Sequence, residues 1–167
     1  MKSILFLVGS LRAESLNARL ARVAAAKLPD AIRDADGVFW TTPEYNYALP
    51  GIVNNAIDWT TRPMLPRHPI VGKPMNVAVA TMSPANGIRS LSDLKRIWAN
   101  CGGVPVTTFD FVLQQAPGKF VEENGVETIE PTALGILRFA IDSLVRAIEG
   151  DAGALVVSNW AAAFGAK

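Results

Sequence analysis

Two short polar segments carry residue types that could bind an anion and a flat ring. The first runs from Gly9 to Asn17 and holds Ser10, Arg12 and Ser15 as well as the closing asparagine. A phosphate needs hydroxyls and backbone N–H groups at a helix start, where the helix dipole is favourable. Arginine can add a planar fork to phosphate oxygens. The segment therefore predicts either a phosphate site or, equally, a capped turn with solvated side chains.

The second polar segment begins with Pro43, Glu44, Tyr45 and Asn46 and is closed by a second proline. A flavin ring has apolar faces and a polar edge. The backbone of an irregular loop can hold that edge while aromatic side chains cover a face. A surface turn between a strand and a helix is the alternative. Two tyrosines flanking Asn46 favour the ligand loop.

A third loop runs from Ser83 to Gly87 and follows another apolar run. It could close over the other end of a ring, or it could be a plain turn. All three loops follow expected strands, and open parallel sheets bind ligands at the carboxyl ends of their strands. Taken together, the loops predict a site for flavin mononucleotide (FMN).

Apolar runs that alternate with amphipathic segments predict the elements that hold these loops. Continuous apolar runs are typical of strands buried on both faces of a parallel sheet. The runs are residues 3–8, 37–42, 76–81 and 104–109. Helical spacing of apolar residues is clearest at 134–148. This alternation predicts an α/β fold with a doubly wound parallel sheet.

A single domain is expected over residues 1–150. Within it, residues 114–130 contain no apolar run or helical period and are expected to be irregular. The tail, residues 151–167, is rich in alanine and nearly uncharged, and the sequence assigns it no structure.

Composition argues against several classes of partner. The 167 residues carry a net charge of +1, and scattered Lys and Arg do not favour nucleic acid. The single cysteine, Cys101, excludes an internal disulfide and fits a reducing, cytoplasmic compartment. The first apolar run is too short to span a membrane. No His, Cys and carboxylate cluster has metal-ligand spacing, so no metal site is expected.

Several single residues are predicted to have structural roles. Cys101 is expected to be half-buried at a helix end, and His68 is expected to be solvated in a proline-rich loop. Trp40, Trp59 and Trp98 fall on expected strands and helices, where packing is the commoner role.

Both polar segments resemble motifs of the NADPH-dependent FMN reductases of flavodoxin-like fold, which include quinone, azo-dye and chromate reductases. Gly-Ser-x-Arg-x-x-Ser-x-Asn matches residues 9–17. Pro-Glu-Tyr-Asn matches residues 43–46, and Pro-Gly and Asn-Ala-Ile-Asp-Trp match residues 50–51 and 55–59. The two motifs together are highly specific. The resemblance runs from Met1 to about Leu144 with one gap.

The resemblance implies the following site residues. The FMN phosphate would be bound by Ser10, Arg12, Ser15 and Asn17. The isoalloxazine would be lined by Pro43, Glu44, Tyr45 and Asn46, with Ser83 and Gly87 nearby. It implies ping-pong hydride transfer from NADPH or NADH through flavin N5 to a quinone, azo or metal-oxyanion acceptor. The flavin carries the chemistry, so no catalytic side chain is named. Members of the family form homodimers or homotetramers.

The sequence departs from the family in one place. The family has a strand and most of a crossover helix between the first helix and the strand before Pro-Glu-Tyr-Asn, and here no residues remain for that second strand. We expect Pro29 to end the first helix. A lost strand would leave the first crossover left-handed, which is rare. We therefore predict that a segment between Pro29 and Ala31 is missing from this sequence but present in the working protein.

Two other functions compete with a reductase. One is a flavodoxin-like electron carrier without NAD(P)H turnover of its own. Such carriers tend to be strongly acidic, so the net charge of +1 argues against it. The other is a flavin-free interaction protein that kept only the fold, which fold alone never excludes. The presence of both motifs argues against that alternative.

Overall fold

A parallel sheet forms the centre of the computed structural model, which describes residues 2–8, 28–62, 67–85, 87–106 and 110–164. Three strands run side by side in chain order: β1 (Ile4–Val8), β2 (Gly37–Thr41) and β3 (Pro74–Ala80). On the far side of β3, β4 (Val104–Pro105) pairs with its start and β5 (Phe111–Leu113) with its end. Every pair in this sheet is parallel, as predicted.

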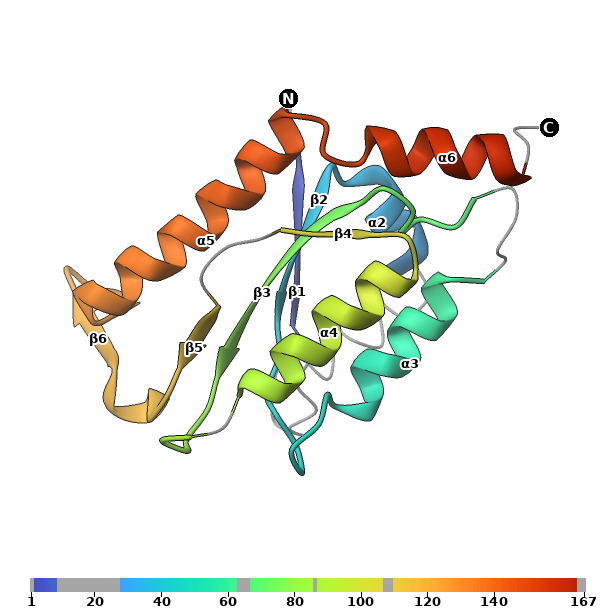
Figure 1. Cartoon of the computed structure of the whole chain (residues 1–167). Helices are drawn as coiled ribbons and strands as arrows, with labels where there is room; N and C mark the ends of the chain where they lie inside the picture. The colour runs from blue at the N-terminus through green and yellow to red at the C-terminus, as the bar shows by residue number, and fades with distance from the viewer. Residues whose placement is uncertain (1, 9–27, 63–66, 86, 107–109, 165–167) are drawn as a thin grey trace.

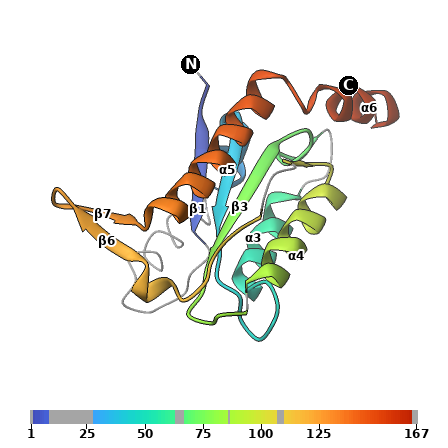
Figure 2. The ribbon, with the colours of Figure 1, turned by 60° about the vertical axis from the view of Figure 1, so that its left-hand side comes forward.

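Helices cover both faces of the sheet (Figures 1 and 2). One face packs against α3 (Gly51–Thr60) and α4 (Ile88–Asn100), and the other against α5 (Pro131–Glu149). Alternate residues of a strand point to opposite faces. Accordingly, Val38 belongs to the α3–α4 core and Phe39 to the α5 core. The doubly wound α/β prediction is confirmed.

A buried amide ties α5 to the sheet. Asn76 in β3 is 1% exposed, and its Nδ2 donates a hydrogen bond to the Ala140 carbonyl at 2.9 Å. Its Oδ1 accepts from the Val77 N–H, also at 2.9 Å. Both ends of the amide are therefore paired, which is what makes a polar side chain tolerable at this depth.

Helix α2 (Leu28–Asp34) completes the crossover from β1 to β2. Its Ile32 is 1% exposed and packs in the same core as α3 and α4. Pro29 lies in the first turn of this helix, and the first helix, which Pro29 was expected to end, lies outside the described residues. Proline fits the first turn of a helix because the N–H it lacks has no helical partner there.

In the described part of the sheet, β1 lies at the edge with β2 as its one partner. A flavodoxin-like sheet ordered 2-1-3-4-5 has its second strand on the outer side of the first. The described order is therefore that of such a sheet without its second strand, as predicted. That the lost residues came from between Pro29 and Ala31 stays a prediction.

The segment expected to be irregular contains a β-hairpin. After a short 3-10 turn, η1 (Ala116–Gly118), come the antiparallel strands β6 (Phe120–Glu123) and β7 (Val126–Ile129). Asn124 and Gly125 connect them with φ of 54° and 77°. Asn-Gly is the preferred sequence for a two-residue turn with both φ positive. The local turn signal, not an apolar run, specifies this element.

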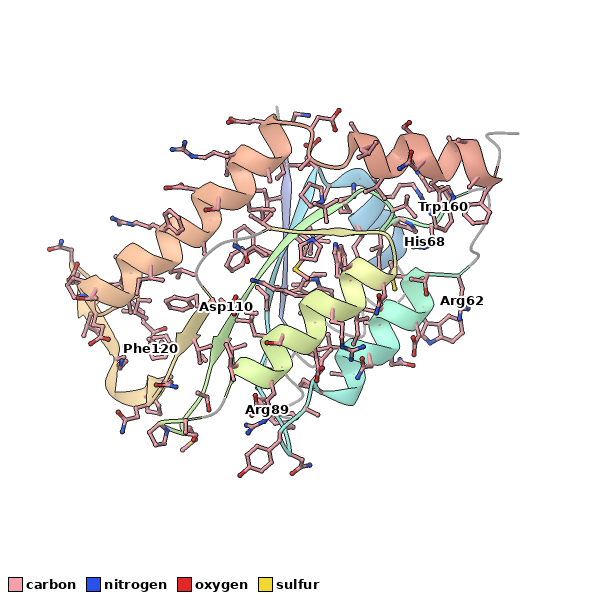
Figure 3. The ribbon with its side chains drawn as sticks, viewed as in Figure 1. Arg62, His68, Arg89, Asp110, Phe120 and Trp160 are labelled. Carbon is pink, nitrogen blue, oxygen red and sulfur yellow. The ribbon has the colours of Figure 1, made fainter. Side chains whose placement is uncertain are left out.

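The tail forms a helix, α6 (Ala154–Phe164), that lies against the segment before β3 (Figure 1). Gly153 packs directly on Gly72, where an added Cβ would overlap the Gly72 carbonyl. The Trp160 ring meets His68 edge-on, with ring centroids 5.4 Å apart (Figure 3). None of the described helices is both long and apolar enough to cross a bilayer.

Two single-residue predictions are wrong. His68 is not solvated but 4% exposed, and burial, with Arg62 second, lowers the pKa of its imidazole. Trp59 is 68% exposed, because it lies beside the buried face of α3 formed by Val53, Ile57 and Thr60. The other residues behave as expected: Trp40 and Trp98 are buried, and Cys101 is half-buried.

Candidate functional site

The loops after β2 and β3 meet at the carboxyl edge of the sheet. Since these strands are adjacent and parallel, their following loops leave the sheet side by side. The Thr42 N–H donates to the Ala78 carbonyl at 3.1 Å, which extends the pairing to the start of the loop. The predicted ring-binding residues Pro43, Glu44, Tyr45 and Asn46 are in the first loop, and Ser83 and Gly87 are in the second.

The described structure thus brings two of the three predicted loops together. The predicted phosphate residues all fall outside the described part of the chain. They are Ser10, Arg12, Ser15 and Asn17.

A tight turn shapes the tip of the first loop. Tyr45 and Ala48 exchange two backbone hydrogen bonds, at 3.0 and 3.1 Å, and close a two-residue connection. The two central residues, Asn46 and Tyr47, have φ of 51° and 62°. Asparagine tolerates this left-handed region, but a bulky aromatic residue is strained there. Strained backbone is common at ligand-binding loops, and Tyr47 is the strained residue of this one.

Replacing Tyr47 by glycine is expected to raise the free energy of unfolding of the ligand-free protein by about 0.5–1 kcal/mol. The relief of left-handed strain is worth about 1–2 kcal/mol. Loss of the exposed cation–π contact to Arg89 offsets about 0.5–1 kcal/mol of this stabilisation. Urea denaturation followed by circular dichroism would measure the change. Tyr45→Gly is the control, because the φ of Tyr45 is not positive; equal destabilisation by both variants would contradict strain at Tyr47.

The Glu44 carboxylate joins the first loop to the start of α4. Its Oε2 accepts hydrogen bonds from the backbone N–H groups of Gly87, Arg89 and Ser90 at 3.0, 3.0 and 3.2 Å. Amides in the first turn have no partner inside the helix. A carboxylate is also favoured there by the helix dipole. The Glu44 side chain is only 1% exposed, so these contacts are shielded from water.

Arg89 connects the same carboxylate to the tyrosine turn. Its Nη1 lies 3.7 Å from Glu44 Oε1, and its guanidinium lies over the Tyr47 ring at 4.8 Å from the centroid. Figure 3 shows Arg89 at the beginning of α4, beside the loop that follows β2. No signal in the sequence points to this residue, because its role depends on a partner 45 positions away.

The second loop is held by its own hydroxyls and a glycine. Ser83 receives the N–H of Ala85 on its Oγ at 3.2 Å and donates its own N–H to Thr81 Oγ1, also at 3.2 Å. Gly87 has φ of 114°, and an added Cβ would lie 2.6 Å from Val112 Cγ1. Only glycine fits this position without displacing its neighbours.

Among the described residues, neither a metal site nor a reactive thiol is found at the carboxyl edge of the sheet. No group of three or more His, Cys, Asp or Glu side chains could hold a metal ion among them. Burial, with the Asp58 carboxylate second, raises the pKa of the Cys101 thiol, which disfavours the reactive thiolate.

The arrangement suits a flat aromatic ligand. The rings of Tyr45 and Tyr47 are 41% and 63% exposed on a loop anchored by a buried carboxylate. Large aromatic surface presented by a fixed loop can cover a ring. Comparison with known proteins gives the same answer: the family model for NADPH-dependent FMN reductases matches residues 24–118, more than half of the chain.

The chain belongs to the NADPH-dependent FMN reductase family. Members of this family are oxidoreductases, and curated relatives carry matching names. The quinone reductase of Escherichia coli is 46% identical over 70 residues, which are 42% of this chain and 36% of that protein. An NAD(P)H-dependent FMN reductase of Pseudomonas aeruginosa is 31% identical over 97 residues, 58% of this chain and 51% of that protein. This family member thus spans between about a third and three fifths of the length of the curated relatives it matches.

Solved structures agree on the fold. The flavoenzyme FerB of Paracoccus denitrificans, an NAD(P)H:acceptor oxidoreductase, superposes with a TM-score of 0.71 at 27% identity. The match covers 90% of this chain and 99% of FerB. The apo form of an NADH:FMN oxidoreductase, EmoB, has a TM-score of 0.60 at 21% identity, with coverage of 86% and 88%. The flavodoxin-like fold is therefore confirmed for this family member.

One alignment bears on the lost strand. A quinone reductase of Pseudomonas putida aligns over 115 positions at 32% identity, covering 60% of that protein but only 49% of this chain. That share of the chain is about 82 residues, so about thirty of the 115 aligned positions have no counterpart in this chain. A strand and a crossover helix need about that many. A gap of that length could hold the missing strand and its crossover helix, and its place in the chain stays a prediction.

Proposed function

We propose that this chain binds FMN at the carboxyl edge of its sheet and passes reducing equivalents from NADPH or NADH to a small acceptor of the quinone class. The observation that carries the proposal is the joining of the loops after β2 and β3 by the buried Glu44 carboxylate. It is supported by family membership and by the quinone reductases among the relatives. Azo compounds and metal oxyanions are further acceptors to test.

The residues present fit the cofactor in two parts. Ser10, Arg12, Ser15 and Asn17 would bind the phosphate, as hydroxyls, an amide and a planar cation can. The ring would be lined by Pro43, Glu44, Tyr45 and Asn46, with Glu44 contributing its backbone, and by Ser83 and Gly87. When bound, the flavin supplies the hydride chemistry, which would run by a ping-pong scheme.

The chain's own contribution is to place the ring and limit its contact with water. The tyrosine turn offers apolar faces, and the backbone of the loop offers hydrogen-bond partners for the polar edge. No side chain has to move a proton, so we assign no catalytic residue. We further propose a cytoplasmic homodimer or homotetramer that has neither nucleic acid nor membrane as a partner.

An absorbance titration tests the proposal. Purified protein should bind added FMN with a saturable change in the flavin band, and NADPH or NADH should then bleach that band. Addition of benzoquinone should restore it over many turnovers. Flavin binding with no bleaching by either nucleotide would favour the electron-carrier alternative. No flavin binding at all would overturn the proposal.

A further inference from the structure

Glu44 stands out because both of its carboxylate oxygens face the loop after β3 and the start of α4. Oε2 is engaged by three backbone amides, at 3.0, 3.0 and 3.2 Å. Oε1 is buried, accepts no hydrogen bond from the described residues, and has Arg89 Nη1 at 3.7 Å. A carboxylate paired in this way points into the protein and is not available to bind a ligand.

We propose that Glu44 is a positioning residue whose side chain fixes the tyrosine loop against α4, and so sets the geometry of the flavin site without itself contacting the ring. The inference rests on the proposed function and deepens it. It also changes the role that the family resemblance gives this glutamate, from lining the isoalloxazine to holding two loops in register.

The argument depends on how the two loops are connected. They follow neighbouring strands, but their tips extend beyond the last strand pairing, so the sheet alone does not fix them. Among the described residues, the Glu44 side chain accepts three hydrogen bonds that join the first loop to Gly87 and the start of α4. Charged hydrogen bonds shielded from water are stronger and more directional than exposed ones.

Arg89 extends the same connection to the ring-bearing residue. Its guanidinium contacts Glu44 on one side and the Tyr47 ring on the other. The strained turn at Tyr47 is therefore held from outside by a group that is itself anchored on α4. Removal of the carboxylate would release both the α4 amides and the cation that covers the tyrosine.

The test compares Glu44→Ala, Glu44→Gln and the control Glu122→Ala. Glu122 is an exposed residue of the β6–β7 hairpin, which lies on the opposite side of the sheet from α4 (Figure 2). Hydrogen exchange of the Gly87, Arg89 and Ser90 amides in the FMN-free protein reports the connection itself. The FMN dissociation constant and the visible circular dichroism of bound flavin report the position of the ring. All are measured below the unfolding transition of every variant.

The expected result is a loss of amide protection in Glu44→Ala, with a dissociation constant about tenfold higher and altered flavin dichroism. Glu44→Gln keeps one acceptor oxygen and should recover part of both effects, and Glu122→Ala should change neither. A purely structural role would lower the melting temperature but leave the dissociation constant and dichroism of the folded variant unchanged.

Unchanged amide protection in Glu44→Ala would overturn the inference, as would wild-type flavin affinity. The two failures can be told apart from failure of the proposed function. If the wild-type protein bound no FMN, the proposed function would fail, while exchange in the FMN-free protein would still decide whether Glu44 holds the loops.

Discussion

Replacing Trp98 by alanine is expected to lower the free energy of unfolding by about 3–5 kcal/mol, the usual loss for truncating a large buried aromatic residue. Trp98 is fully buried in the core between the sheet and α4. Its ring meets Trp40 edge-on at 6.3 Å, and its Nε1 donates to the Lys73 carbonyl at 2.9 Å. An added Cβ at Gly103 would lie 2.2 Å from the indole, so the backbone packs closely on it.

Trp59→Ala is the matched control. That indole belongs to α3 and is 68% exposed, so its removal should change stability by less than about 0.5 kcal/mol. Guanidinium denaturation followed by far-ultraviolet circular dichroism would measure both variants. Similar losses for the two tryptophans would contradict the burial assigned to each.

Replacing Gly87 by alanine is expected to weaken both the fold and the flavin site. A φ of 114° is open to glycine and strained for alanine, at a cost of about 1–3 kcal/mol. The new Cβ would also lie 2.6 Å from Val112 Cγ1 and 3.0 Å from Val79 Cγ1. Since the Gly87 N–H donates to Glu44, relief of this overlap by movement of the loop would pull the amide from the carboxylate.

Gly135→Ala provides a control of opposite sign. Gly135 is an exposed residue within α5, and nothing lies within 4 Å of an added Cβ. Alanine in the interior of a helix is favoured over glycine by about 0.5–1 kcal/mol. Denaturation midpoints and FMN titrations of the two variants would separate the effects. A Gly87→Ala protein with wild-type stability would contradict the backbone strain.

The strands and long helices were predictable because their buried positions hold apolar residues, in continuous runs for the strands and at helical spacing for the helices. The continuous apolar runs found β1, β2 and β3, and helical spacing found α4 and α5. The β6–β7 hairpin was missed for the opposite reason: β6 is exposed along its length, so it has no apolar run. The Asn124-Gly125 turn was the signal that could have found it.

The candidate site was predictable only in part. Its loops could be found because each follows a strand and carries unusual polar and aromatic residues. The anchoring of Glu44 on α4 could not be found, since it joins residues more than forty positions apart through backbone amides, which have no sequence signature. Trp59 shows a related limit: helical spacing predicts a helix but does not fix how wide its buried face is.

The parallel pairing of the main sheet affects the order in which the parts of the protein fold. Each parallel pair can form only after a long crossover has closed, and such non-local pairing is intrinsically slow. The hairpin pairs Phe120 with Ile129 and can form within about 1–10 μs. We therefore expect local turns and helices to appear first during folding. Glu44 can reach the amides of α4 only after β2 and β3 have paired, so the part of the molecule nearest the chemistry is among the last to be assembled.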